Sequence, residues 1–302
     1  MIEAQLTPQN ETIGTGSTDK IANALTIDVE DYFQVSAFAP YISRDGWNQR
    51  ECRVERNVDR ILALLSDQGT LATFFILGWI AERYPALVRR IAEQGHEIAS
   101  HGYGHQRASD LSRDEFLSDI LMAKCILEDL SGAPLIGYRA PSFSIGVGNL
   151  WAFDCLAEAG YRYSSSVYPI QHDHYGMPDS PRFAYVAKPS LIELPVTTVN
   201  IFGKNLPASG GGYFRLFPFP LSRWMMNRVN QRDAQSGIFY FHPWEIDTNQ
   251  PRVPGIDSKT RFRHYVNISK MEEKLVRLLK AFHWGRVDHV FEKEIARGAS
   301  FA

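Results

Sequence analysis

Three carboxylates stand close together where a strand is predicted to end. In the segment LTIDVEDYFQ, residues 25–34, apolar residues suited to a buried strand are followed by Asp28, Glu30 and Asp31. Like charges at this spacing repel one another and oppose ionisation. A nearby cation would relieve this repulsion.

A histidine pair offers a place for such a cation. The segment HEIASHGYGH supplies His101 and His105 four positions apart, a spacing at which two imidazoles can face one point. Gly102 and Gly104 disfavour a regular helix, so we expect a loop or a single turn. Imidazole nitrogen suits zinc and similar ions, and one carboxylate would complete three ligands with a position left open for water. The spacing alone equally allows a pair that only caps and hydrogen-bonds a glycine-rich loop.

Two more predicted strands end in ionisable residues. YRAPSF places Arg139 at one strand end, and FYFHPWE places His242 at another. Taken singly, Arg139 is best explained as a salt-bridge partner and His242 as a hydrogen-bonded core histidine. Four strand ends that each carry ionisable groups are not expected of a purely structural barrel, and parallel α/β folds place their active sites at such ends.

Strands and helices alternate along the first half of the chain, which predicts parallel strands covered by helices in an α/β fold. The predicted strands are ALTID, LATFFILG, HEIASHG, LIGYRAP and YRYSSSVY. The predicted helices are VERNVDRILALLSDQG, ERYPALVRRIAEQG, SRDEFLSDILMAKCILEDLSG, with Ser112 as its N-cap, and NLWAFDCLAEAG.

The pattern changes after about residue 170. QHDHYGMPDSPRF and NLPASGGGYFRLFPFP are predicted to be long loops, SGIFYFHPWEID a further strand, and SKMEEKLVRLLKAF the last helix. RFRHYVN, from Arg261 to Asn267, is interpreted as a basic surface loop in preference to a lid that contacts substrate. We predict one domain over residues 23–290, with an extension from about residue 245, a flexible tail at 1–22 and a second tail at 291–302.

Composition excludes several classes of protein. Apolar residues make up 44% of the 302 residues and charged residues 22%, as in ordinary globular proteins, and a formal charge of −2 gives no reason to expect nucleic acid as a partner. No apolar run is long enough to span a bilayer, and the N-terminus lacks the apolar core of a secretory signal, so we expect a cytoplasmic location. Cys52, Cys125 and Cys155 are too widely spaced to indicate a disulfide framework or a thiolate metal site.

Read in order, TIDVED, SHGYGH, RAPSF and FYFH resemble the motif series of the polysaccharide deacetylase family, the carbohydrate esterases that share the NodB homology domain. The resemblance runs from about residue 24 to 245. Through DVEDYFQ and HPWEID the chain looks most like the deacetylases of exopolysaccharide and exosortase gene clusters. The resemblance implies a deformed (β/α) barrel with about seven parallel strands and a divalent metal, most often zinc, with cobalt or nickel also suited. It also implies removal of N-acetyl groups from an amino-sugar polysaccharide or a lipid-linked oligosaccharide reached at the membrane surface.

The resemblance also implies roles for individual residues. Asp28 matches the catalytic base, Arg139 the arginine that orients it, and His242 the general acid. His101 and His105 match the metal-binding histidines, and the backbone N–H of Ser142 is expected to help hold the oxyanion.

The chain departs from the family pattern in two places. The family has two adjacent aspartates where this chain reads Asp-Val-Glu-Asp, so the metal carboxylate is Glu30 or, as the alternative, Asp31. We favour Glu30 because residues two apart on a strand point the same way, which sets it beside Asp28. Phe143 replaces a glycine that is usual after the third motif, which puts the shape of that loop in question.

Some assignments stay open. Tyr103, Phe143 and Trp244 are candidates to stack on sugar rings, although core packing explains any one of them as well. The acid that keeps His242 protonated is Asp154, Glu245 or Asp247.

Two other function classes compete with the deacetylase. One is an allantoinase-like barrel hydrolase that acts on a small amide without metal, against which the intact histidine pair argues. The other is a non-catalytic carbohydrate-binding relative, against which the joint presence of Asp28, Arg139 and His242 argues.

Overall fold

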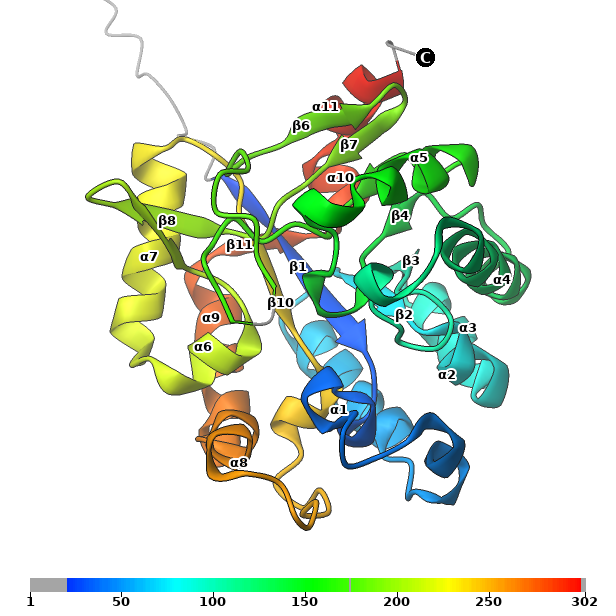
Figure 1. The fold of residues 1–302 in the computed structure, drawn as a ribbon. Coiled ribbons are helices and arrows are strands. Elements are labelled where there is room, and N and C mark those ends of the chain that lie inside the picture. The colour runs from blue at the N-terminus through cyan, green and yellow to red at the C-terminus, as the bar shows by residue number, and fades with distance from the viewer. Residues whose placement is uncertain (1–20, 174, 300–302) are drawn as a thin grey trace, which may run out of the picture.

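The computed structural model describes residues 21–173 and 175–299 (Figure 1). Most of the tail predicted at 1–22 therefore lies outside the described residues. The first strand, β1, already begins at Ala22. Among the described residues, no helix is both long and apolar enough to cross a membrane.

A nine-stranded, mostly parallel sheet forms the centre of the molecule. Seven of its strands run parallel in the order β10-β1-β2-β3-β4-β5-β7, which confirms the predicted deformed barrel. Between the described strands no pairing joins β10 to β6, so the barrel is open on that side. These strands are β1 (Ala22–Val29), β2 (Thr73–Ile76), β3 (Glu97–Ser100), β4 (Gly137–Tyr138), β5 (Tyr163–Ser164), β7 (Leu191–Glu193) and β10 (Ile238–Phe241), with β6 (Tyr185–Lys188) antiparallel to β7 and β11 (His283–Gly285) beside the start of β1.

Helices cover the outer face of the sheet, as the alternating pattern predicts. Helix α4 starts where the sequence indicates, because Ser112 and Glu115 form a capping box, and it ends at Gly132 with φ 68°. The first-half helices are α1 (Val54–Asp67), α2 (Gly78–Arg83), α3 (Pro85–Glu93), α4 (Arg113–Ser131) and α5 (Trp151–Glu158). Short 3₁₀ helices, η1 to η8, occupy Tyr32–Gln34, Ser36–Phe38, Arg44–Gln49, Ala108–Asp110, Pro141–Phe143, Val147–Asn149, Pro243–Ile246 and Ile268–Lys270.

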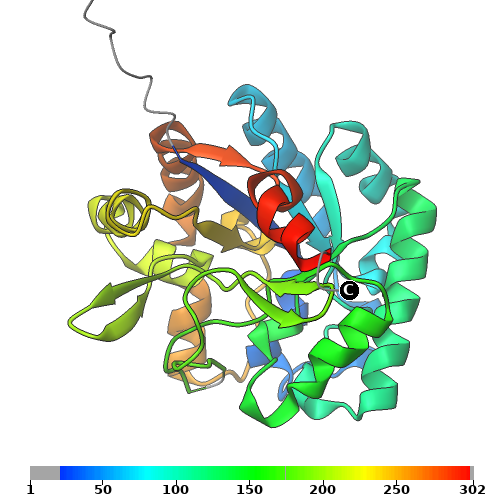
Figure 2. The ribbon, with the colours of Figure 1, turned by 90° about the horizontal axis from the view of Figure 1, so that it is seen from above.

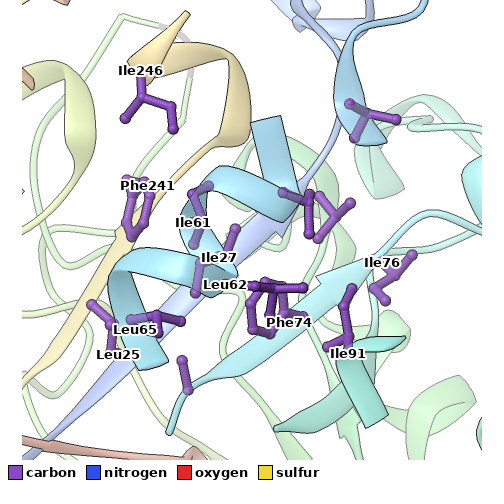
Figure 3. Packing of buried hydrophobic residues seen from close by; sticks show 14 of the residues in the cluster. Leu25, Ile27, Ile61, Leu62, Leu65, Phe74, Ile76, Ile91, Phe241 and Ile246 are labelled. Carbon is purple, nitrogen blue, oxygen red and sulfur yellow. The ribbon is translucent and has the colours of Figure 1, made fainter. Parts of the chain in front are cut away.

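The two-residue period of β1 decides which side chains face the helices and which face the barrel interior. Leu25 and Ile27 join the core between sheet and helices, whereas Ala24 packs in the interior cluster. Asp28 shares the parity of Ala24, so the same alternation turns it toward the interior. Figure 3 shows the outer core, with Leu25 and Ile27 packed among Ile61, Leu62 and Leu65 of α1 and Phe74 of β2.

The segment predicted to be loops contains further elements. The hairpin β8 (Thr198–Ile201) and β9 (Lys204–Pro207) is followed by α6 (Gly211–Leu216) and α7 (Phe219–Arg232). The loop prediction for NLPASGGGYFRLFPFP was therefore wrong. Its glycines allow close packing: a Cβ on Gly211 would clash with the carboxylate of Glu245.

The C-terminal region is also more ordered than predicted. Arg261–Tyr265 belong to helix α8 (Ser258–Tyr265), so the loop prediction there was wrong; Asp257 caps this helix by accepting from the backbone N–H groups of Lys259 and Thr260. Helix α9 (Met271–Ala281) is not the last one, because α10 (Val287–Val290) and α11 (Glu292–Ala299) follow it. The predicted tail at 291–302 was thus wrong for 292–299, because Ile295 of α11 belongs to the same buried interior cluster as Ala24 of β1. Figure 2 shows these last helices, in red, over the centre of the sheet.

Candidate active site

A cleft of about 720 Å³ opens at the carboxyl ends of the parallel strands. Its lining includes Asp28 and Glu30 from the end of β1, the two histidines that follow β3, and His242, which follows β10. The structure therefore brings together ionisable residues from strand ends that are far apart in the sequence.

Glu30, His101 and His105 lie at one point of this cleft. All three are buried, and one possible ligand atom of each lies within 4.8 Å of those of the other two. Glu30 Oε2 is 2.7 Å from His105 Nε2, yet among the described residues it accepts no hydrogen bond of ordinary geometry. Glu30 therefore offers a buried carboxylate oxygen that accepts no hydrogen bond from the described part of the chain and faces two imidazoles. One carboxylate and two imidazoles are a set of ligands that fits a divalent cation such as zinc.

The neighbours of these side chains favour the protonation states that a cation requires. His101 Nδ1 is 2.8 Å from the carbonyl oxygen of Arg139, which can only accept, so Nδ1 carries the proton and Nε2 keeps its lone pair. Burial, reinforced by His105, lowers the pKa of His101 to about 4 despite the opposing charges of Asp28 and Glu30. Burial raises the pKa of Glu30, but His105, His242 and His101 outweigh it and hold that pKa below its ordinary value.

Asp31, the alternative carboxylate, points away from the cluster. Its side chain accepts from the backbone N–H of Tyr32 at 2.8 Å and of Val54 at 2.9 Å, and also from that of Arg53. Asp31 thus caps η1 and holds the start of α1, a local structural task.

Arg139 fixes Asp28 at the end of β1. Its Nη1 donates to Asp28 Oδ1 at 2.6 Å and to Thr26 Oγ1 at 2.8 Å. Its other nitrogens donate to the carbonyl oxygen of Ser165 at 3.1 Å and to its hydroxyl at 3.0 Å. The guanidinium is fully buried and lies 4.0 Å from the centre of the Phe75 ring. Such a saturated, packed guanidinium leaves Asp28 little freedom to turn.

The turn that contains Ser165 rests on a buried carboxylate. Glu193 Oε1 accepts from the backbone N–H groups of Ser166 and Val167, both at 2.8 Å. Burial raises the pKa of Glu193 to about 7, although these donors oppose the shift. Sequence reasoning missed both Ser165 and Glu193; the available signals were the three serines within YRYSSSVY and a single carboxylate in the otherwise apolar segment LIELPV.

His242 lines the same cleft as the carboxylates of Asp28 and Glu30. Its Nε2 is 3.5 Å from Glu30 Oε1 and 4.0 Å from Asp28 Oδ2, and its Nδ1 lies 2.7 Å from Glu245 Oε1. Burial opposes the charged imidazole, but Glu30, Glu245 and Asp28 outweigh it and raise the pKa of His242 to about 9.

Among the three acids considered for His242, the structure places Glu245 beside it. Asp154 instead pairs with Lys188, and Asp247 pairs with Arg53. Glu245 is itself held by Arg215, whose Nε lies 3.3 Å from Glu245 Oε2. This chain of contacts fixes the ring of His242 through its Nδ1 and leaves Nε2 directed at the cleft.

Ser142 and Phe143 form a turn at the cleft rim. Both have left-handed backbone conformations, with φ of 56° and 50°. Such φ values favour glycine, and Phe143 adopts one at the position where the resemblance implies a glycine. The Phe143 ring lines the cleft and packs edge-on against Tyr240.

The two other aromatic candidates differ in placement. Tyr103 is not among the cleft-lining residues and its hydroxyl donates to Glu82 at 2.7 Å, so its contact with substrate stays a prediction. Its backbone N–H donates to Asp119 Oδ2, a contact that sequence reasoning missed and that holds the histidine loop. Trp244 does line the cleft, but it is 5% exposed, stacks on His242 and donates to Glu30 Oε1 at 3.1 Å. Its place suits support of Glu30 better than stacking on a sugar.

Comparison with known proteins identifies two segments of the chain. Residues 44–164 match the family described as polysaccharide deacetylase, and residues 165–292 match a domain of unknown function, DUF3473. Two Bacillus cereus proteins named peptidoglycan-N-acetylglucosamine deacetylase are similar. One is 36% identical over 103 residues, 34% of this chain and 46% of the relative; the other is 40% identical over 73 residues, 24% of this chain and 26% of the relative. The chain thus aligns with less than half the length of either relative.

A solved structure extends the likeness to nearly the whole chain. A Mycobacterium smegmatis protein assigned to the polysaccharide deacetylases matches with a TM-score of 0.60 at 20% identity, over 94% of this chain and 93% of that one, which shows a shared fold. Glu30 precedes the first matched segment and His242 lies in the second, so both parts of the chain build one cleft. Residues 44–164 are thus similar to the polysaccharide deacetylase family, and residues 165–292 to the DUF3473 domain.

Proposed function

We propose that this chain is a metal-dependent hydrolase that removes N-acetyl groups from an amino-sugar-containing glycan. The observation that carries the proposal is the meeting of the Glu30–His101–His105 cluster, the Asp28–Arg139 pair and His242 in one cleft. The names of the similar Bacillus cereus proteins support the substrate class.

Glu30, His101 and His105 would hold the cation, with zinc the best match to one carboxylate and two imidazoles and cobalt or nickel as alternatives. When bound, the cation supplies Lewis-acid polarisation of the acetamido carbonyl and lowers the pKa of the attacking water.

Asp28 acts as the general base. Its Oδ1 is tied to Arg139 Nη1 at 2.6 Å, which leaves Oδ2 to receive the proton of the attacking water. Arg139 is a positioning residue, because it contacts Asp28 and Ser165 and fixes the direction of the carboxylate.

His242 acts as the general acid. An amine leaves an amide only after its nitrogen gains a proton, and a histidine with a raised pKa holds that proton at neutral pH. Nδ1 is engaged by Glu245, so Nε2 is the atom that donates.

The backbone N–H of Ser142 is assigned to the developing oxyanion. The neighbouring N–H, that of Phe143, is already bonded to the carbonyl oxygen of Ala140 at 3.0 Å. One such donor typically contributes about 3 kcal/mol to the stability of the transition state.

The cleft volume of about 720 Å³ suits a bound oligosaccharide segment. We assign the glycan to exopolysaccharide biosynthesis, either as a polymer or as a lipid-linked oligosaccharide, on the resemblance of DVEDYFQ and HPWEID.

Acetate release from N-acetylglucosamine oligomers tests the activity. We expect release by the protein loaded with zinc, loss of release with a chelator, and recovery when the metal is returned. Oligomer binding without acetate would identify a carbohydrate-binding relative, and chelator-resistant hydrolysis of a small amide would identify an allantoinase-like enzyme.

Two matched variants test the metal site. Glu30→Gln should lose bound zinc, measured by elemental analysis of dialysed protein, whereas Asp31→Asn should keep it because that side chain faces backbone N–H groups. The opposite result would exchange the two assignments.

A further inference from the structure

A long stretch of the chain carries basic residues and no acidic ones. Residues 194–232 contain Lys204, Arg215, Arg223, Arg228 and Arg232 but neither Asp nor Glu, in a chain whose formal charge is −2. Arg215 is buried against Glu245, and the other four reach the surface. This part of the molecule therefore presents positive charge.

The same stretch exposes large apolar side chains. Of the thirteen that are exposed in the described part of the chain, five belong to it: Phe202, Leu206, Leu216, Leu221 and Trp224. Such a concentration of exposed apolar area in a short segment marks an interaction surface.

The hairpin β8–β9 and helix α7 carry four of these five side chains, and Leu216 is the last residue of α6. The hairpin projects from the body of the molecule beside α7 in both views (Figures 1 and 2). On α7, Leu221, Trp224, Arg228 and Arg232 follow helical spacing, and the guanidinium of Arg228 lies 5.7 Å from the Trp224 ring centre. A groove of about 810 Å³ between the two elements is lined by Arg182, Asn200, Ile201, Phe202, Trp224, Arg228, Arg232 and Asp233. None of these residues lines the catalytic cleft.

Phe202 is not explained by the turn that it occupies. Phe202 and Gly203 connect the two strands with φ of 50° and 80°, the pattern of a hairpin turn that favours Asn, Asp or Gly at both positions. The Phe202 ring is 102% exposed, so it contributes nothing to the core. A phenylalanine that suits neither the turn nor the core indicates a contact outside the chain.

We propose that this face, formed by the hairpin β8–β9 and helix α7, docks on an anionic lipid bilayer. Aromatic rings flanked by arginine and lysine are the composition that settles at the bilayer interface, where the rings enter the headgroup region and the cations meet lipid phosphates. Asp233, the acidic residue in the groove, is paired with Arg182 at 2.8 Å. A ring at the tip of a projecting hairpin suits insertion into lipid better than a fit into a protein pocket. The inference does not rest on the proposed catalysis.

Co-sedimentation of the full chain with vesicles tests the docking. We expect binding to vesicles that contain phosphatidylglycerol, weaker binding as salt is added, and little binding to vesicles of phosphatidylcholine alone.

Paired variants separate the apolar and charged contributions. Phe202→Ser with Trp224→Ser should weaken binding about tenfold or more. Arg228→Gln with Arg232→Gln should weaken it about fivefold per arginine and reduce its salt dependence. Matched controls are Val147→Ser, which removes an apolar side chain 80% exposed elsewhere, and Arg89→Gln with Lys280→Gln, which removes two exposed charges elsewhere. The controls should bind like the unaltered chain, and thermal unfolding should confirm that all variants are folded.

Three results would overturn the proposal. The first is absence of binding to anionic vesicles at low salt. The second is equal losses in the patch variants and the controls. The third is a dimer in sedimentation velocity that Phe202→Ser dissociates while vesicle binding persists unchanged, which would make this face a contact between copies of the chain.

Discussion

Replacing Glu193 with glutamine tests whether a buried carboxylate makes the stability of the fold depend on pH. Glu193 is fully buried at the end of β7, where Oε1 accepts from the N–H groups of Ser166 and Val167. Its Oε2 accepts no hydrogen bond within the described residues. Glutamine keeps an oxygen for these two donors and replaces the ionisable Oε2 with an NH2 group that does not titrate.

The size of the effect follows from the pKa. Burial raises the pKa of Glu193 from 4.5 to about 7, so between these values the folded protein holds a proton that the unfolded chain releases. The folded state then binds more protons, and the free energy of unfolding falls as pH rises through this window. A difference of about 2.5 in pKa corresponds to about 3 kcal/mol in the free energy of unfolding, and this contribution is lost in full above about pH 8.

Urea unfolding of both proteins between pH 5 and pH 8.5 measures this loss. Burial also raises the pKa of Glu97 to about 7. Glu97 is present in both proteins, so its contribution to the pH dependence of the free energy of unfolding cancels when the two proteins are compared. The free energy of unfolding of Glu193→Gln, relative to the unaltered protein, should rise by about 3 kcal/mol from the lowest to the highest pH. Parallel pH profiles would refute the reasoning, because they would show that Glu193 ionises in the folded protein as readily as in the unfolded chain.

The remaining predictions concern the catalytic cleft and its support. Asp28→Asn should keep bound zinc but lose about a thousandfold in acetate release, because an amide cannot take the proton; loss of zinc would make Asp28 a ligand. His242→Ala should keep bound zinc, but its rate of acetate release should fall about a hundredfold or more, and its pH–rate profile should lose the alkaline limb. The rate should be partly restored on an ester substrate, and equal losses of rate on amide and ester would exclude a general acid. Asp31→Ala should lower the free energy of unfolding by about 2–4 kcal/mol in urea titrations, because buried N–H groups lose their acceptor, and unchanged stability would contradict its capping task.

Sequence reasoning succeeded where a local rule decides the outcome. The apolar run ALTID forms β1 as predicted, and Ser112 is the predicted N-cap of α4, where the Ser112–Glu115 capping box sets the start of the helix. It failed for α8, whose polar residues lack an apolar period and whose start depends on the cap Asp257. It failed again for α11, which is held by packing of Ile295 in the barrel interior.

The partners of the site residues needed the tertiary structure. Trp244 donates to Glu30 across 214 positions of the chain, and Arg139 reaches Asp28 across 111. Glu245 was one of three acids considered for His242, and only the packing of Arg215 and Gly211 around it sets it beside the ring.

The amino-acid sequence by itself determined the types of chemical group, the strand ends that carry them and the side of β1 from which Asp28 projects. Spacing within a few residues decides these features, because backbone geometry repeats at every turn or pleat. The tertiary structure decided which carboxylate joins His101 and His105, which acid holds His242, and how Glu193 supports Arg139 through Ser165. These contacts depend on distances between elements that are remote in sequence. The curvature of the sheet and the pairing of its buried charged groups set those distances.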